Sequence, residues 1–416
     1  MLAFLLIMAM LGMTACMKDQ CKQVHSYTYY TPVYQTQEIV MDNIKSNASK
    51  EIATPGKIAI LGNYIYLNEV DKGVHVIDNS DPAHPKNVAF IDIPGNVDIA
   101  IKGNILYADM YANLVAIDIS NPADVKVTKT IEQLFPERQW SNGFIWNNQR
   151  QVIVDWTRHD TTVMEACDNR QQWFNGRTDI FVANFAAQNS AVPAAASPIG
   201  TGGSMARFTI VGENMYAVDH HYLRTVSLKE EKNPVSVNES FAGFDIETIY
   251  PFKNKLFIGS MGGLYIYDLS NPIVPTQQST FVHARACDPV VADDHNAYVT
   301  LRAGTSCGPT ENELQVINVD NVQSPFLEAK YAMTSPYGLG KDGDLLFICD
   351  GADGLKIYDA SDVKAIKLVK TIGGINTYDV IAFNNKALVV AKDGLYQYDY
   401  SNTSAIQFLS KITINK

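Results

Sequence analysis

Four acidic residues lie at or near the start of short apolar runs in different parts of the chain: Asp98, Glu247, Asp288 and Asp379. If these runs are strands around a central channel, the carboxylates ring one mouth of that channel and attract a cation. Calcium is bound by about six to eight oxygen ligands, and sequence spacing alone does not supply that number. A calcium or other divalent site is one hypothesis, and a ring of solvated carboxylates is the other.

A second set of residues suits binding rather than catalysis, because aromatic, His and Arg side chains give large contact areas and hydrogen-bond donors. The set consists of Trp140, His159, Trp173, His221, His283, Arg285 and Arg302. They are expected on the same face as the longer predicted loops, which are Thr157–Thr178, Ala303–Glu313 and the shorter His220–Tyr222. They predict a ligand-binding face, and the alternative is a group of solvated loops whose polar side chains are satisfied locally.

Aspartates also recur directly before Ser-Asn or Ser-Asp turns, at Asp78, Asp118, Asp268, Asp359 and Asp399. Short carboxylate side chains accept backbone N–H groups in such turns. Repeated copies do not offer the two unlike environments that a catalytic carboxylate pair requires. We therefore interpret these aspartates as structural.

Known catalytic signatures are absent from the sequence: it has no nucleophile elbow, P-loop or dinucleotide fingerprint. No His, Cys and Asp cluster has the spacing of a zinc site. A binding or scaffolding role is therefore favoured over an enzyme. The alternative is a metal-dependent hydrolase of lactonase-like type that uses the four channel carboxylates.

The six cysteines fall into different classes. Cys287 and Cys307 flank two strands that are expected to pair, so a disulfide between them is predicted. Cys349 ends an apolar run and is interpreted as a small buried hydrophobic residue. The prediction of a disulfide requires an exported protein, because disulfides persist outside the cytosol.

The first residues indicate export. Residues 1–13 are apolar and uncharged, too short for a comfortable membrane span, and Met13-Thr14-Ala15-Cys16 resembles a bacterial lipobox. We expect a signal peptide at 1–15, lipidation of Cys16 and a tether at 16–55 that ends in an extended strand. Lys18 and Asp19 resemble a sorting signal for the outer membrane. The predicted location is the outer membrane, facing the cell exterior or, alternatively, the periplasm.

Residues 56–416 repeat a pattern of short apolar runs. From Asp78 to Asp118 is 40 residues, from Asp268 to Asn318 is 50, and from Asp359 to Asp399 is 40. A period of about 40 to 50 residues with four strands is typical of β-propeller blades. We predict an all-β propeller of eight blades, or seven if Arg138–Gln188 is an insertion. Its closure is expected to pair a strand from one terminus with the blade of the other.

Three segments carry a family resemblance: Val74-His75-Val76-Ile77-Asp78, Leu114-Val115-Ala116-Ile117-Asp118 and Leu355-Lys356-Ile357-Tyr358-Asp359. They resemble the LVIVD repeat of bacterial surface and secreted β-propellers, over about residues 56–416. The resemblance implies the fold and says little about activity.

Composition limits the partners. The formal net charge is −11 and no Lys/Arg-rich run is present, so nucleic acid is excluded as a partner. We expect a cell-envelope module that binds a glycan, a peptide or a protein and reaches the membrane through its lipid.

Overall fold

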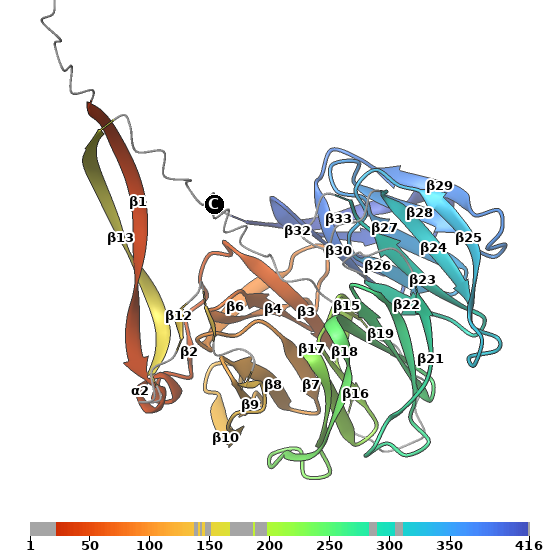
Figure 1. Cartoon of the computed structure of the whole chain (residues 1–416). Coiled ribbons are helices and arrows are strands. Elements are labelled where there is room, and N and C mark those ends of the chain that lie inside the picture. The colour runs from red at the N-terminus through yellow and green to blue at the C-terminus, as the bar shows by residue number, and fades with distance from the viewer. Residues whose placement is uncertain are drawn as a thin grey trace, which may run out of the picture. The chain divides into compact units, whose positions relative to one another are not determined.

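The computed structural model describes residues 22–136, 140–141, 144–145, 151–166, 186–187, 198–282, 289–303 and 311–414. Within these ranges the protein is almost entirely β-structure (Figure 1). The described helical elements are α2 (Gln37–Asp42) and the 3-10 turn η2 (Thr403–Ala405). No helix in these ranges is long and apolar enough to cross a membrane. The predicted signal peptide, residues 1–15, and Cys16 lie outside the described residues.

The chain divides into two compact units. The described part of the smaller unit is a two-stranded sheet of β1 (Lys22–Thr36) and β13 (Gln151–Ala166). The hydroxyls of Ser26 and Thr162 are 3.2 Å apart, and the Thr28 hydroxyl donates to Asp160 at 2.5 Å. Residues later in β1 contact residues earlier in β13, so the two strands run antiparallel.

His159 belongs to this smaller unit. Its ring stacks on Tyr29 with centroids 4.9 Å apart, and its Nε2 lies 2.8 Å from the Thr31 hydroxyl. His159 was expected in a loop of the propeller, but it lies in strand β13. The β-branched residues on both sides of His159 favour extended chain, which explains the strand.

Four sheets of the larger unit consist of four consecutive antiparallel strands each. In chain order the first two are β7 (Ile99–Lys102), β8 (Ile105–Met110), β9 (Asn113–Asp118) and β10 (Lys126–Ile131), then β22 (Val290–Ala292), β23 (Asn296–Leu301), β24 (Glu313–Asn318) and β25 (Phe326–Ala332). The other two are β26 (Leu339–Asp342), β27 (Leu345–Cys349), β28 (Leu355–Asp359) and β29 (Lys367–Ile372), then β30 (Thr377–Phe383), β31 (Lys386–Ala391), β32 (Gly394–Asp399) and β33 (Gln407–Thr413). Each sheet is a propeller blade.

The first blade is extended at both edges. Its strands are β3 (Pro55–Leu61), β4 (Tyr64–Glu69), β5 (Gly73–Asp78) and β6 (Lys86–Asp92). The short strand β2 (Lys45–Asn47) pairs with the outer strand β6. On the inner side, β15 (Thr201–Ser204) pairs with β3, and β14 (Ala186–Ala187) pairs with β15. A segment distant in sequence is therefore added to the innermost strand.

A six-stranded sheet contains β16 (Phe208–Val211), β17 (Asn214–Ser227), β18 (Val235–Phe252), β19 (Lys255–Ser260), β20 (Gly263–Asp268) and β21 (Thr276–Val282). β17 folds back on itself, because Leu228 N donates to Glu213 O at 2.7 Å. A straight strand of 14 residues would separate these two groups by about 45 Å. The turn falls at His220, whose φ is 41°. The two halves of β17 are therefore neighbouring strands.

The described residues contain six sheets of four or more strands, so the β-propeller class is confirmed and eight blades are not found. Between β10 and β15 the described strands are β11 (Trp140–Ser141), β12 (Phe144–Ile145), β13 and β14. None of them belongs to a separate four-stranded sheet. The stretch Thr157–Thr178 is mostly polar, so it has no apolar runs to bury between neighbouring blades.

The recurring aspartates have the predicted structural role. Oδ1 of Asp78, Asp118, Asp268, Asp359 and Asp399 accepts the backbone N–H of the serine two residues later, at 2.6 to 3.0 Å. Lys232 and the two Ser120 donors lower the pKa of Asp118 to about 2. Each aspartate stabilises the turn between the third and fourth strands of its repeat.

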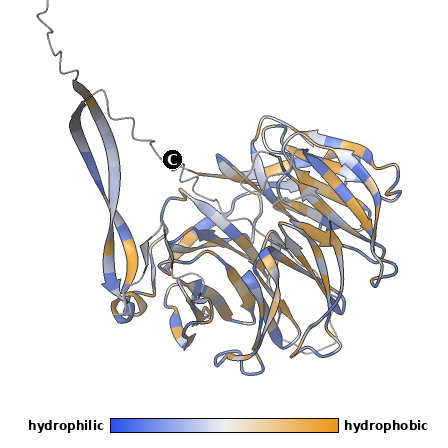
Figure 2. Ribbon diagram, viewed as in Figure 1, coloured by the Kyte–Doolittle hydropathy of each residue, from blue (hydrophilic) through white to orange (hydrophobic). Residues whose placement is uncertain are grey.

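The core lies between the blades, whose inner strands are apolar on both faces (Figure 2). Every residue of β8 and of β23 is buried. The first and last blades share one core, in which Ile65 and Leu67 accompany Leu388 and Val390. The prediction of closure by an exchanged strand is wrong, because the first and last blades each have four consecutive strands of their own. Closure depends on side-chain packing instead.

Candidate functional site

In a four-stranded meander, the turn between the second and third strands lies on the same side as the connection to the next blade. We call this side the connection face. It receives the end of each second strand and the start of each innermost strand, so residues at those places are the candidates for a binding site.

Buried carboxylates at the ends of second strands hold this face together. Glu69 is the last residue of β4, Asp109 is the residue before the end of β8, and Asp350 directly follows β27. Each of these side chains is 3% exposed or less. Asp109 Oδ1 accepts the N–H groups of Val97 and Asp98 at 2.9 and 2.7 Å. Each of the three carboxylates accepts N–H groups from the connection that enters its blade. These acids are therefore structural.

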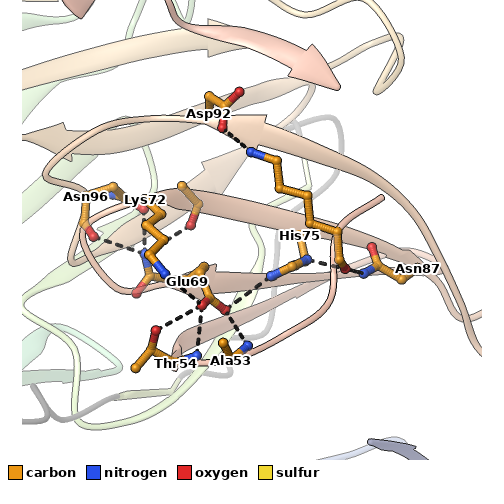
Figure 3. A network of polar contacts seen from close by, with 11 residues as sticks. Ala53, Thr54, Glu69, Lys72, His75, Asn87, Asp92 and Asn96 are labelled. Atoms are coloured by element: carbon orange, nitrogen blue, oxygen red, sulfur yellow. Dashed lines mark hydrogen bonds and ion pairs between the residues drawn. The ribbon is translucent and has the colours of Figure 1, made fainter. Parts of the chain in front are cut away.

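Glu69 has the densest set of donors (Figure 3). Oε1 accepts Thr54 N at 2.8 Å, and Oε2 accepts Ala53 N at 3.2 Å and lies 3.3 Å from His75 Nε2. The Asn87 amide can only donate to His75 Nδ1, so Nε2 carries the ring proton and donates to Glu69. Burial raises the pKa of Glu69, but the hydrogen bonds from His75, Thr54 and Ala53 outweigh it and lower the pKa to about 2.

The region expected to be an open channel contains β15, which contacts the innermost strands β3, β26 and β30. Lys57 Nζ donates to Met205 O at 2.9 Å and lies 3.7 Å from Asp98 Oδ2. Asp98 also accepts Arg207 N at 2.6 Å and Ile99 N at 2.8 Å. The Lys57 and Asp98 side chains are 3% and 1% exposed, so this is a buried ion pair.

Asp379 is also fully buried, and its Oδ1 accepts the Ser204 hydroxyl at 3.3 Å. A Cβ atom added at Gly203 or Gly338 would lie 2.1 Å from a carboxylate oxygen of Asp379, so both positions require glycine. Burial raises the pKa of Asp379 well above its usual range, against the smaller opposing effects of Lys57 and Ser204.

The hypothesis of solvated carboxylates at a channel mouth is wrong for Asp98 and Asp379, because β15 and the blades bury both. Glu247 is half-buried in β18, and Asp288 lies outside the described residues. In the described ranges no group of three or more His, Cys, Asp and Glu side chains is arranged to hold a metal ion. Donors of the chain itself contact both oxygens of Asp98, and the Ser204 hydroxyl contacts one oxygen of Asp379.

An exposed aromatic cluster lies on the connection face. It consists of His221, Tyr222, Phe241 and Phe244. Phe241 and Phe244 are 57% and 67% exposed, and their ring centroids are 5.3 Å apart at 74°. The His221 ring lies 5.3 Å from Phe244, and the Tyr222 ring lies 6.1 Å from Phe241. Four rings from two turns thus form one surface.

The turns that carry the aromatic cluster have unusual backbone conformations. His220 and Asp245 have φ values of 41° and 51°, in the left-handed region that non-glycine residues rarely adopt. Gly243 has a φ of 154°, and an added Cβ would lie 2.7 Å from the Tyr265 ring. Such conformations persist where the surrounding structure imposes them, and they occur often at binding sites.

Arg302 follows β23 in a different blade of the connection face. Its guanidinium carbon lies 3.8 Å from the centroid of the Tyr337 ring. Tyr337 in turn contacts Tyr378, with centroids 5.2 Å apart at 74°. Tyr337 lies two residues before β26 and Tyr378 is the second residue of β30, so both lie near the start of the innermost strand of their blades, close to the ring axis. We call Arg302 and these two tyrosines the tyrosine stack.

The structure separates the predicted ligand-binding residues. His221 belongs to the aromatic cluster, Arg302 to the tyrosine stack and His159 to the smaller unit. Trp140 lies in β11, for which only the backbone is described. Trp173, His283, Arg285 and the predicted disulfide partners Cys287 and Cys307 lie outside the described residues. Cys349 is a buried free thiol, as predicted, and burial raises its pKa well above its usual range.

Four aromatic residues of these two sites were not predicted from the sequence: Phe241, Phe244, Tyr337 and Tyr378. A signal was present, since Phe241-Ala242-Gly243-Phe244 places two large apolar residues around a glycine in a connection between repeats. Tyr337 and Tyr378 stand at similar places in two consecutive repeats.

Comparison with known proteins agrees with this architecture. The model of the LVIVD repeat matches residues 55–91 and 95–130, and no curated protein matches the sequence. A computationally designed protein, Ika8, has a TM-score of 0.52 at 8% identity, with coverage of 88% of this chain and 90% of its own. Sqt1 of Saccharomyces cerevisiae has a TM-score of 0.51 at 9% identity, with coverage of 89% and 88%.

A protein from Lactobacillus plantarum is also similar, with a TM-score of 0.51 at 10% identity and coverage of 89% of this chain and 96% of its own. At these identities the similarity shows the fold alone. The two matched repeats cover the blades β3 to β6 and β7 to β10, whose third strands end in the recurring aspartates. The chain is therefore a β-propeller whose first two blades carry LVIVD repeats.

Proposed function

We propose that the chain is a binding or scaffolding module of the bacterial cell envelope, and that its aromatic cluster holds a partner protein. The observation that carries this proposal is the exposure of Phe241 and Phe244 at 57% and 67% on one face of a rigid scaffold. Large aromatic side chains at the centre of an interface supply much of the binding energy. Rings that already contact one another lose little conformational freedom on binding.

The chemistry of the aromatic cluster favours a protein over a glycan. Phenylalanine has no hydrogen-bond donor or acceptor, whereas sugar hydroxyls need polar partners when they are desolvated. Two adjacent phenylalanine rings suit an apolar side chain of a partner. His221 and Tyr222 supply polar atoms at the edge of this surface, as in protein interfaces with an apolar centre and a polar rim.

We expect a photo-crosslinking residue at position 244 to capture a defined envelope protein in the native cell. The Phe241→Ala/Phe244→Ala double variant should then bind the purified partner at least about tenfold more weakly, which corresponds to about 1.4 kcal/mol. Fluorescence anisotropy with the labelled partner measures the dissociation constant.

The matched control is Phe408→Ala. Phe408 is also 57% exposed, but it lies on the outer strand β33 and contacts Tyr396 and Tyr398. This variant should bind the partner as the wild type does. Equal weakening in the control and the double variant, or no weakening in either, would remove the aromatic cluster as the binding site.

The proposal includes export and attachment to the outer membrane through a lipid on Cys16. Acyl chains contribute about 0.8 kcal/mol per buried methylene to membrane binding, so a lipidated chain needs no membrane-spanning helix. We expect incorporation of a labelled fatty acid by the wild type and none by Cys16→Ala. Equal labelling of both proteins would refute the anchor, and protease treatment of intact cells distinguishes the outer from the periplasmic face.

We also infer a ring of seven blades. The support comes from the six-stranded sheet, in which β17 folds back at His220 and β18 turns near Asp245, so that the sheet carries two consecutive repeats. The other five sheets carry one repeat each.

A further inference from the structure

The tyrosine stack beside the ring axis carries an arginine that has no carboxylate partner within the described residues. Arg302 is half-buried, and its guanidinium carbon lies 3.8 Å from the centroid of the Tyr337 ring. Two other arginines differ in this respect, since Arg158 pairs with Asp160 at 3.0 Å and Arg224 with Glu239 at 2.7 Å. The chain has 44 Asp and Glu residues for 33 Lys and Arg residues, so an arginine without a carboxylate partner among the described residues is unexpected.

The backbone that carries the tyrosine stack is held firmly. The Thr300 hydroxyl donates to Tyr337 O at 2.6 Å, and Gly338 N donates to Tyr378 O at 2.9 Å. These bonds connect three neighbouring blades through the residues of the stack. The site is therefore arranged before any ligand arrives, which reduces the entropy cost of binding.

The described residue that follows Arg302 is also held by a hydrogen bond. Asn312 Oδ1 accepts Ala303 N at 2.7 Å, and Asn312 Nδ2 donates to Thr334 O at 2.6 Å. The guanidinium carbon lies over the Tyr337 ring, and a planar guanidinium that stacks on an aromatic ring keeps its N–H edge for hydrogen bonds in the plane.

We propose that Arg302, Tyr337 and Tyr378 form a subsite for the carboxylate of an acidic sugar. The planar guanidinium donates two parallel hydrogen bonds to the two carboxylate oxygens. The tyrosine rings beside it offer apolar surface to the C–H groups of the sugar ring, and their hydroxyls offer polar partners to its hydroxyl groups. The C-terminal carboxylate of a peptide has the same charge but lacks the sugar ring, so the two tyrosine rings favour the sugar.

Burial raises the pKa of Tyr378, so its hydroxyl stays protonated near neutral pH and can donate a hydrogen bond. This subsite rests on the proposed binding role of the connection face, but it uses residues separate from the aromatic cluster. Photo-crosslinking at position 244 and a sugar titration are independent measurements, so either proposal can fail while the other holds.

The test is a titration of the full-length chain with sodium glucuronate, followed by NMR saturation transfer. Uncharged glucose and the peptide-like carboxylate N-acetylglycylalanine serve as comparison probes. We expect glucuronate to bind at least about tenfold more tightly than glucose, and more tightly than the acetylated dipeptide. The Arg302→Lys variant keeps the charge and loses the planar pair of donors, so glucuronate should bind it about tenfold more weakly.

Arg158→Lys is the matched control, because it makes the same change at an ion-paired arginine of the smaller unit. It should bind glucuronate as the wild type does, and thermal unfolding checks that both variants are folded. Equal binding of glucuronate and glucose, or unchanged glucuronate binding by Arg302→Lys, overturns the proposal. Tighter binding of the dipeptide assigns the subsite to a peptide terminus and also overturns it.

Discussion

We expect the Lys57→Met variant to lose about 3–5 kcal/mol of its free energy of unfolding. The reason is that Asp98 would keep its buried negative charge without its cation. The Lys57 and Asp98 side chains are 3% and 1% exposed and lie 3.7 Å apart. Loss of the Lys57 ammonium also leaves Met205 O without the 2.9 Å hydrogen bond that joins it to the first blade. Methionine fills a similar volume, so the loss reports on charge more than on packing.

Equilibrium denaturation in guanidinium chloride, followed by tyrosine and tryptophan fluorescence, measures this loss. Lys126→Met is the matched control, since Lys126 and Asp124 are 75% and 68% exposed and lie 3.6 Å apart. Exposed ion pairs contribute about 0–1 kcal/mol, so the control should change little. If Lys57→Met costs no more than Lys126→Met, the buried pair does not have the role assigned to it.

A double variant separates the charge effect from the loss of the lysine itself. Asn at position 98 keeps an oxygen that can accept Arg207 N but removes the negative charge. We therefore expect Lys57→Met/Asp98→Asn to lose less than the sum of the two single variants, because the residues interact directly. A simple sum would mean that Lys57 and Asp98 stabilise the fold independently.

The repeat could be predicted from sequence because its signals are local. Asp78 and the serine two residues later are adjacent in the chain, and short apolar runs alternate with turns at nearly constant spacing. Such features depend on backbone geometry and on the burial of each strand, not on distant partners. The same reasoning failed at Thr157–Thr178, where the polar sequence does not continue the repeat.

The surroundings of Asp98 and Asp379 could not be predicted, because they depend on contacts between distant residues. Arg207 is 109 positions after Asp98, and Ser204 is 175 positions before Asp379. The inserted strand β15 has the sequence Thr-Gly-Gly-Ser, which carries little strand propensity. Its position follows from the fit of Gly203 against Asp379, which only the folded structure reveals.

The candidate site was found only in part. His221 was recognised because paired histidines in a predicted turn are conspicuous. Phe241 and Phe244 were overlooked because an isolated apolar residue in a sequence is usually part of the core. Exposure of two such residues on one face is a property of the fold. Aromatic residues beside a glycine in a connection between repeats deserve the same scrutiny as histidine and arginine.

We expect the free energy of unfolding to fall at acidic pH because Glu69 becomes protonated. The pKa of this carboxyl is lowered from 4.5 to about 2 in the folded protein. A lowered folded-state pKa contributes stability that is fully present above the unfolded value, near pH 4.5, and is lost as the pH falls towards 2. A difference of this size corresponds to about 3 kcal/mol. The wild type should therefore lose about that amount between pH 5 and pH 2 through Glu69 alone.

Glu69→Gln removes the titrating group while it keeps the size of the side chain. We expect this variant to be less stable than the wild type at pH 7 by about 3 kcal/mol, and the difference should shrink towards zero near pH 2. Urea denaturation at a series of pH values measures both proteins, and other titrating groups cancel in the comparison. Glu38→Gln, at an exposed position of α2, is the control and should follow the wild type at every pH. Only the charged form of Glu69 accepts all the hydrogen bonds from Ala53, Thr54 and His75. A difference in free energy of unfolding between Glu69→Gln and the wild type that stays constant from pH 7 to pH 2 would therefore show that Glu69 stabilises the first blade by packing and not through its charge.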